Sequence, residues 1–218
     1  MSQTKDDSQV DDKRTAESKR YELVMQLWGH NLRYPPEFLR APRPKTSAEP
    51  TRQSIQLFLQ RGWWAQPKMR GHSAQIHLQS DGFKAAYTHN GAVPKTPVPK
   101  EVTDALHVLF PSLEGPTIVL ADWAKSRNTL FLFDVLKING RRLTSEDYST
   151  RYSHLPRFTG SKHFVTLPVL TTVIAAHKAL MESYDSDHIE GLLFRAPHHK
   201  GLEDMALVRC RKTGVQGK

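Results

Sequence analysis

The sequence predicts an α+β domain in which antiparallel sheets are flanked by helices. Short runs rich in β-branched and aromatic residues alternate with turns that contain glycine, asparagine or proline, as in antiparallel sheets. A few longer stretches instead show the 3.6-residue periodicity of amphipathic helices. The regular alternation of strand and helix that marks a parallel sheet is missing from the sequence.

The composition is that of an ordinary globular protein. The chain has 218 residues, of which 24% are charged and 38% are hydrophobic, and these proportions exclude wholesale disorder. No apolar run approaches the roughly 18 residues that a membrane span needs, and the polar start Met1–Asp12 does not resemble a signal peptide. The single cysteine, Cys210, cannot form an internal disulfide. We therefore expect an intracellular protein with no membrane partner.

The charge balance favours a polyanionic partner. Lysine and arginine number 31 and aspartate and glutamate 22, which gives a net charge of +9 and a pI of about 9.7. Ribosomal proteins, polymerases and heparin-binding proteins share this trait, so charge alone indicates contact with nucleic acid without deciding the function.

Three regions are expected along the chain. Residues 1–20 alternate in charge and are predicted to form a flexible arm. Residues 21–50 should form a short amphipathic helix, Tyr21–Trp28, followed by a proline-rich extended segment, Arg33–Pro50, that wraps over the domain surface. Residues 51–214 should form the main domain.

Four stretches of the main domain are predicted to be helical. Thr51–Gln60 offers Ile55, Leu57, Phe58 and Leu59 as a buried side. Pro99 precedes a helix over Lys100–Phe110, and Pro168–Tyr184 forms a longer one. Thr144–Asp147 resembles a capping box that opens a short helix.

The predicted strands have high β-propensity and are bounded by turns, such as the turn at Asn139-Gly140. In chain order they are Trp63–Lys68, Ala74–Gln79, Lys84–Thr88, Thr117–Trp123, Leu130–Ile138, Gly191–Arg195 and Met205–Arg211. Trp63 and Trp64, at the start of the first strand, are expected to pack against the helix Thr51–Gln60.

Five segments carry residues suited to chemistry. In chain order they are Pro67–Gly71 (PKMRG), Ile118–Trp123 (IVLADW), Leu130–Leu136 (LFLFDVL), Ile189–Arg195 (IEGLLFR) and Leu207–Lys212 (LVRCRK). Each has an ordinary explanation: a lysine before a glycine turn is usually a surface residue, and paired phenylalanines on one strand face usually pack in a core. The order of the segments is more informative than any one of them.

In this order the segments resemble the covalent nucleotidyltransferase superfamily, which includes ATP-dependent DNA ligases, RNA ligases and mRNA capping enzymes. The resemblance covers about Trp64–Lys212 and is greatest to the adenylation domain of short viral or bacteriophage ATP-dependent DNA ligases. IEGLLFR matches the Glu-Gly motif of the family, and Phe131–Tyr152 is similar to its Phe-Asp segment. Lys68–Gly71 matches the nucleophile motif Lys-x-Asp-Gly in part. The resemblance implies a ligase-type nucleotidyltransferase, ATP-grasp-like fold.

The resemblance also implies roles for residues that would bind the nucleotide. Lys68, followed by Gly71 of the same motif, would attack the α-phosphate of ATP and hold AMP as a phosphoramidate. Phe133 would stack on the adenine ring, with Asp134 beside it. His89 lies where ligases commonly carry Ser-Arg-x-Gly and would touch the nucleotide.

The remaining implied roles concern metal and phosphate. Asp122 would stand near the ribose or the metal, where the family usually has glutamate, and Glu190 would help to hold Mg²⁺. Arg209 and Arg211 would grip phosphates together with the adjacent Lys212.

The chemistry of the reaction needs these residue types. A lysine attacks phosphorus only as the free amine, although an exposed lysine loses its proton only near pH 10.4, so the site must desolvate it or place cations beside it. A triphosphate needs Mg²⁺ held by one or two carboxylates and cations on the leaving oxygens. Adenine favours an apolar slot with an aromatic platform.

Three departures from the family leave a second class of function open. Arg70 replaces the usual aspartate, Asp122 replaces glutamate, and the closing motif has arginine where ligases mostly have lysine. A non-catalytic nucleic-acid-binding relative is the alternative that these departures suggest. No OB-fold module is expected after the last basic strand, so the chain would be either a minimal catalytic domain or a fragment.

The sequence thus predicts an ATP-dependent DNA ligase that seals 5′-phosphate/3′-hydroxyl nicks through lysyl-AMP, with ATP and Mg²⁺ as cofactors. An RNA ligase and a capping-type guanylyltransferase are the alternatives within the superfamily. The expected partner is nicked duplex DNA, with RNA left open, bound by a monomer or with an accessory DNA-binding module. Such an enzyme would serve DNA repair or replication, in the cytoplasm of a bacterial host if a phage encodes it. Basic residues that could contact phosphates are Lys125, Arg127, Arg141, Arg142, Arg151, Arg157, Lys162, Lys200 and Lys218.

Other site classes are excluded by their motifs. There is no Gly-rich phosphate loop, no Gly-x-Ser-x-Gly elbow and no Cys/His spacing of a structural zinc site, although the chain has 11 histidines.

Overall fold

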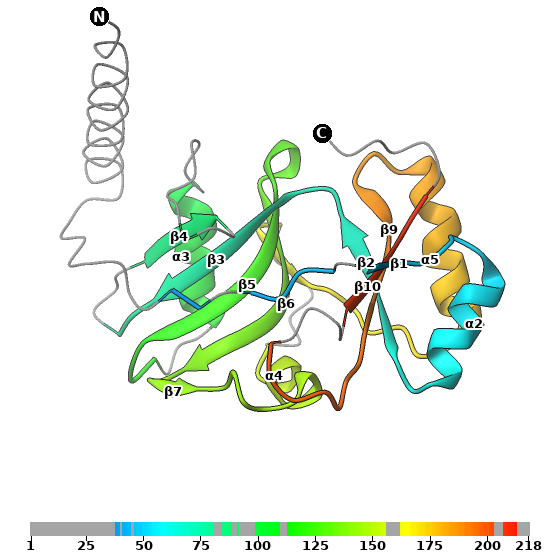
Figure 1. Ribbon diagram of the computed structural model, residues 1–218. Coiled ribbons are helices and arrows are strands. Elements are labelled where there is room, and N and C mark those ends of the chain that lie inside the picture. The colour runs from blue at the N-terminus through cyan, green and yellow to red at the C-terminus, as the bar shows by residue number, and fades with distance from the viewer. Residues whose placement is uncertain are drawn as a thin grey trace, which may run out of the picture.

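Two mainly antiparallel sheets lie side by side and carry helices on their outer faces (Figure 1). The computed structural model describes residues 38–39, 41–44, 46–80, 84–88, 91, 99–109, 113–155, 162–202 and 207–212. The predicted arm, the predicted helix Tyr21–Trp28 and His89 lie outside these residues. The α+β class with antiparallel sheets is confirmed.

The smaller sheet has the strand order β1-β10-β9-β2. Its strands are β1 (Thr46–Ser47), β10 (Leu207–Arg211), β9 (Ile189–Arg195) and β2 (Trp64–Met69). Pairing is antiparallel except between β1 and β10, which run parallel. Within the proline-rich segment, Thr46–Ser47 form β1, which closes one edge of this sheet.

The larger sheet has the order β4-β3-β5-β6-β7, with β8 pairing in parallel along the first part of β6. Its strands are β3 (His72–Leu78), β4 (Lys84–Thr88), β5 (Thr117–Ala124), β6 (Thr129–Ile138), β7 (Arg141–Arg142) and β8 (Phe164–Thr166). The turn between β6 and β7 places Asn139 at φ 48° and Gly140 at φ 82°, as the Asn-Gly pair predicted. β7 and β8 are too short to show a sequence pattern.

Helices α2 (Arg52–Gln60) and α5 (Val173–Asp185) cover the outer face of the smaller sheet. Each begins at a threonine whose hydroxyl accepts a backbone N–H: Thr51 from Ser54 and Thr172 from Ala175. The core between helices and sheet contains Ile55, Ala65, Ala176, Ala179, Leu180, Leu192, Phe194, Val208 and Cys210.

Two predictions about these helices were wrong in detail. Leu57 was expected to be buried, but 45% of it is exposed. The helix predicted from Pro168 begins only at Val173, because Leu170 exchanges two backbone hydrogen bonds with Ala65 at the edge of β2 (2.7 and 3.1 Å).

The larger sheet is backed by α3 (Lys100–Leu109), from which Val102 and Ala105 pack into its core. The short helix α4 (Tyr148–Ser153) lies at one end of both sheets (Figure 1). The predicted capping box at Thr144–Asp147 was wrong in register, because the N-cap is Asp147, whose carboxylate accepts the backbone N–H of Thr150. No helix of the residues described here is long and apolar enough to cross a membrane.

Each sheet has an inner face that is turned toward the other sheet, and the candidate site described below lies between these two faces. Leu192, Phe194 and Cys210 point outward to α2 and α5, so their strand neighbours point inward. Trp63 packs on Phe58 as predicted (ring centroids 5.3 Å apart). The same expectation was wrong for Trp64, which contacts Tyr148 and Tyr152 of α4 on the inner side.

Candidate active site

Lys68 lies on the inner side of the smaller sheet, where β2 pairs with β9. It stands opposite Gly191 in the antiparallel register, and the register shifts between Lys68 and Met69. Lys68 Nζ lies 3.0 Å from Glu190 Oε2, and both side chains are mostly buried, with 20% and 15% exposed. The strand pairing thus sets an amine beside a carboxylate in a partly desolvated position.

Gly191 makes this arrangement possible. Its φ of 140° is a backbone conformation that favours glycine, and a Cβ there would collide with the backbone carbonyl of Cys210 on β10. The close approach of β9 and β10 brings Arg211 Nη2 to 3.5 Å from Glu190 Oε2. Glu190 therefore lies between two cations from two neighbouring strands.

Two buried polar atoms of this group have no hydrogen-bond partner among the described residues. Glu190 Oε2 is buried, yet neither cation approaches it at a hydrogen-bonding angle, although both lie within ion-pair distance. The buried Nε of Arg211 likewise has no hydrogen-bond partner among the residues described. Buried polar groups are normally hydrogen-bonded. A buried carboxylate and a buried guanidinium that lie together without hydrogen-bond partners are typical of sites that bind a ligand.

Asp122, on β5 of the larger sheet, belongs to the same electrostatic group. Burial raises the pKa of this carboxyl, while the positive charges of Lys68 and Arg195 oppose the rise. The nearby negative charge of Glu190 raises the pKa further. The structure therefore brings Lys68, Asp122, Glu190 and Arg211 together from four strands of two sheets.

Phe133 of β6 borders this group and is covered on one side by Arg195 of β9. The Arg195 Cζ lies 4.8 Å from the ring centroid of Phe133 and also 4.8 Å from that of Tyr148 on α4. Only 5% of Arg195 is exposed. A buried guanidinium between two rings holds both rings in place.

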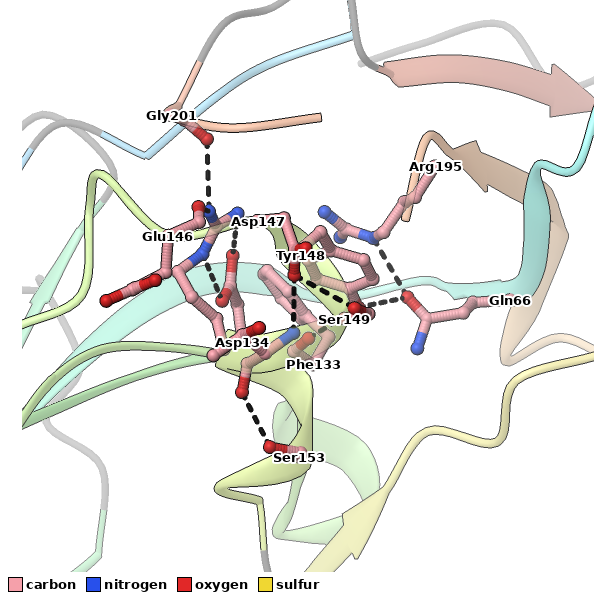
Figure 2. Close-up of polar contacts among 12 residues, drawn as sticks. Gln66, Phe133, Asp134, Glu146, Asp147, Tyr148, Ser149, Ser153, Arg195 and Gly201 are labelled. Atoms are coloured by element: carbon pink, nitrogen blue, oxygen red, sulfur yellow. Dashed lines mark hydrogen bonds and ion pairs between the residues drawn. The ribbon is translucent and has the colours of Figure 1, made fainter. Parts of the chain in front are cut away.

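The buried amide of Gln66 links this stack to β2, the strand that carries Lys68 (Figure 2). Gln66 Oε1 accepts the Nε–H of Arg195 at 2.8 Å and lies 2.8 Å from the hydroxyl of Tyr148. The same hydroxyl donates to the backbone carbonyl of Phe133 at 2.7 Å. Burial raises the pKa of Tyr148, so its hydroxyl remains a donor.

The sequence reasoning missed Gln66, Tyr148 and Arg195 as parts of the site. Gln66 precedes Lys68 by two residues and so shares its strand face, which is a signal that the period of a strand provides. Arg195 lies two residues after Leu193 on β9 and so shares a strand face with it, but Leu193 is not a residue of the site. No local pattern in the sequence pointed to Tyr148.

Asp134 does not lie beside Phe133 on the same surface. Its carboxylate receives two hydrogen bonds from Arg151 of α4, from Nε at 3.0 Å and from Nη2 at 3.2 Å (Figure 2). Arg151 also donates to the carbonyls of Glu146 and Gly201. Both partners are buried, so the expectation that Arg151 contacts phosphates was wrong.

The side chains of other predicted site residues are engaged elsewhere, although the backbone N–H of Lys212 donates to the carbonyl of Glu190 at 3.1 Å. Lys212 Nζ donates to the carbonyls of Ser183 and Ser186 at the end of α5, and Arg209 Nε donates to Ser47 Oγ at 3.0 Å. Gly71 serves close packing, because a Cβ there would lie 2.9 Å from the carbonyl oxygen of Trp123. Arg70 is exposed, and its backbone N–H donates to His188.

The carboxylates Asp122 and Glu190 are the residues of this group suited to a divalent metal. In the part of the chain that is described, no three histidine, cysteine, aspartate or glutamate side chains form a cluster. Mg²⁺ is commonly held by one or two carboxylates together with substrate phosphates. The donor set, with one carboxylate oxygen that receives no directed hydrogen bond, fits such an ion.

Comparisons with known proteins find a likeness in structure alone. No protein-family model matches the sequence, and no curated protein matches it either. A mycobacterial DNA ligase D in complex with ATP superposes with a TM-score of 0.50 at 14% identity, over 78% of this chain and 60% of that one. The ligase domain of M. tuberculosis LigD gives the same values. An archaeal ATP-dependent RNA ligase gives a TM-score of 0.44 at 15% identity, over 80% of this chain and 48% of that one.

These values show a shared fold. The chain spans about 60% of the length of the two ligase structures with the higher score. Its two sheets therefore have the arrangement found in a DNA ligase domain.

Proposed function

We propose that this chain is the adenylation domain of an ATP-dependent polynucleotide ligase that acts on DNA. Lys68 would take AMP from ATP, pass it to a 5′-phosphate end, and so activate that end for attack by a 3′-hydroxyl. The observation that carries the proposal is the contact of Lys68 with Glu190 beside Arg211, in a fold shared with a DNA ligase domain.

In the first step the Nζ–P bond forms as the bond from the α-phosphorus to pyrophosphate breaks. The amine must lose its proton first, and the carboxylate of Glu190, 3.0 Å away, is the acceptor within reach. Arg211 would then hold the phosphate oxygens, because its guanidinium lies 3.5 Å from the same carboxylate and its Nε has no hydrogen-bond partner among the described residues.

Phe133 would carry the adenine on the part of its ring that Arg195 leaves uncovered. The guanidinium of Arg195 and the amide of Gln66 would keep that ring fixed when no base is bound. Asp122 and Glu190 would hold Mg²⁺, which, when bound, spreads the charge that develops on the phosphates.

The test is covalent labelling. The protein is incubated with α-³²P-labelled ATP, and in parallel with labelled GTP, in the presence of Mg²⁺, and denatured protein is examined for label. We expect label from ATP that is lost in Lys68→Ala and kept in Lys178→Ala, which removes an exposed lysine of α5. Nicked DNA and nicked RNA added to the labelled protein then identify the polymer that is sealed.

The other outcomes of the labelling and sealing experiment indicate different activities. Label from GTP alone would show a capping-type enzyme, and sealing of RNA alone would show an RNA ligase. Failure of the wild-type protein to take label, with nucleic-acid binding retained, would overturn the proposal in favour of the non-catalytic relative that Arg70 suggests.

A further inference from the structure

A cavity that contains two basic side chains lies apart from the Lys68 group, at the end of the larger sheet. Its volume is about 360 Å³, and it is lined by Glu101, Arg127, Asn128, Lys162 and His163. These residues come from the first turn of α3, from the turn between β5 and β6, and from the segment before β8. Cavities that hold small ligands are commonly about 300–1,000 Å³.

Among the described residues that line this cavity, basic side chains outnumber carboxylates. Arg127 and Lys162 supply two basic side chains to the lining, and Glu101 supplies one carboxylate. Within the described residues, neither cation makes an ion pair, whereas Glu101 Oε1 accepts the side-chain N–H of Asn128 at 3.3 Å. The two cations are exposed and therefore available to a partner from solution.

Hydrogen bonds hold the backbone segments of Arg127 and Lys162 next to each other. The hydroxyl of Thr129 lies 3.0 Å from the carbonyl oxygens of both Arg127 and Lys162 and so bridges the two segments. Leu130 N donates to the carbonyl of His163 at 2.8 Å, next to the parallel pairing of β6 with β8. The backbone positions from which Arg127 and Lys162 extend are thus fixed relative to each other, although each exposed side chain still loses rotamer freedom when it binds an anion.

The cavity stands at the end of the strand that carries Asp122. β5 runs from Asp122 directly into the turn that contains Arg127. Along this edge Lys125 lies over the ring of Trp123 at 5.3 Å, and His72 lies opposite Trp123 in the register. The turn before His72 also holds the exposed Arg70, so a further basic residue lies between this end of β5 and the Lys68 strand.

We propose that this cavity binds a phosphate group in the sugar-phosphate backbone of the polynucleotide substrate, an inference that rests on the proposed function. Arg127 would engage two phosphate oxygens with its planar fork, and Lys162 would add a point charge. The contact is to the backbone and so would not depend on base sequence.

The test compares two double variants of the full-length protein. Arg127→Ala/Lys162→Ala removes the cavity cations. Arg52→Ala/Lys178→Ala removes one arginine and one lysine from α2 and α5, which cover the outer face of the smaller sheet (Figure 1). Binding of a fluorescein-labelled nicked DNA duplex is measured by anisotropy over a series of salt concentrations, and thermal unfolding checks that both variants fold.

We expect the cavity variant to bind roughly tenfold more weakly at physiological salt, with the slope of log affinity against log salt reduced by about 1–2. Labelling of Lys68 by ATP should match that of the wild type, because this step needs no polynucleotide. Equal affinity and slope in the cavity variant and the wild type, or an equal loss in the control, would overturn the inference.

A further measurement distinguishes binding of the polynucleotide from binding of a free anion. If the cavity variant loses binding of inorganic pyrophosphate, measured by calorimetry, and keeps its affinity for the duplex, the cavity serves a free anion and the inference is wrong. Failure of the proposed function would show separately, as absence of lysine labelling in the wild type.

Discussion

The guanidinium of Arg195 lies between the rings of Phe133 and Tyr148, with its Cζ 4.8 Å from each centroid. Its Nε–H is bound by Gln66, two residues before Lys68 on the same strand. One side chain, Arg195, therefore joins the two aromatic rings to the strand that carries Lys68, and so fixes Phe133 of the larger sheet relative to β2 of the smaller sheet.

Replacement of Arg195 should weaken nucleotide binding more than it slows the covalent step. Arg195→Lys keeps the charge and loses the planar contact with both rings, and a cation–π contact contributes about 0.5–2 kcal/mol. We expect the ATP concentration for half-maximal labelling to rise roughly 3- to 30-fold with a nearly unchanged maximal rate. The control is Arg52→Lys, which changes an exposed arginine of α2. An unchanged half-maximal ATP concentration in Arg195→Lys would contradict the role given to the contact of Arg195 with the two rings.

Removal of Arg151 should destabilise the fold strongly. Arg151→Met leaves the buried carboxylate of Asp134 without its two hydrogen bonds, and loss of one partner from a buried pair costs about 3–5 kcal/mol. Urea unfolding measures the loss. The double variant Asp134→Leu/Arg151→Met should recover much of the stability, since it leaves no buried charge; a double variant as unstable as the sum of its single changes would refute this account.

Gly191→Ala should disrupt both stability and labelling. The new Cβ collides with the backbone of β10, and the φ of 140° adds strain, so β9 and β10 must separate. Arg211 would move away from Glu190. We expect a loss of at least about 2 kcal/mol in urea unfolding together with loss of label. Gly140→Ala, in an open turn with φ 82°, is the control for backbone strain without collision.

Acid should destabilise the protein through His77. Burial, aided by the charge of Lys137, lowers the pKa of His77 from 6.5 to about 4. The unfolded chain therefore binds a proton near pH 6.5 that the folded chain resists until about pH 4, so stability falls as the pH drops through this range. The full effect is roughly 3 kcal/mol. His77→Gln should unfold with a smaller difference between pH 7 and pH 4.5 in urea; an equal difference would exclude His77 as the cause.

The sequence was sufficient to predict most strands and the residues that depend on strand register. Lys68, Glu190 and Arg211 follow local motifs, and the pairing of β2, β9 and β10 brings them together. The site residues that depend on tertiary contacts were not predictable. Tyr148 reaches Gln66 and Phe133 only because α4 lies against both sheets, and Arg151 is buried only because Asp134 turns toward α4. Neither contact leaves a periodic signature in the chain.

The parallel pairing of β1 with β10 has a practical consequence. Ala48 N donates to the carbonyl of Arg209, and Thr46 and Ser47 stand beside Val208 and Arg209. A version of the protein shortened past Ser47 would leave the outer rim of β10 with unsatisfied amides, open to strand addition from a neighbouring copy. Shortened versions made for crystallisation should therefore retain Thr46 and Ser47. Without these residues, the copies will tend to associate through the exposed edge of β10.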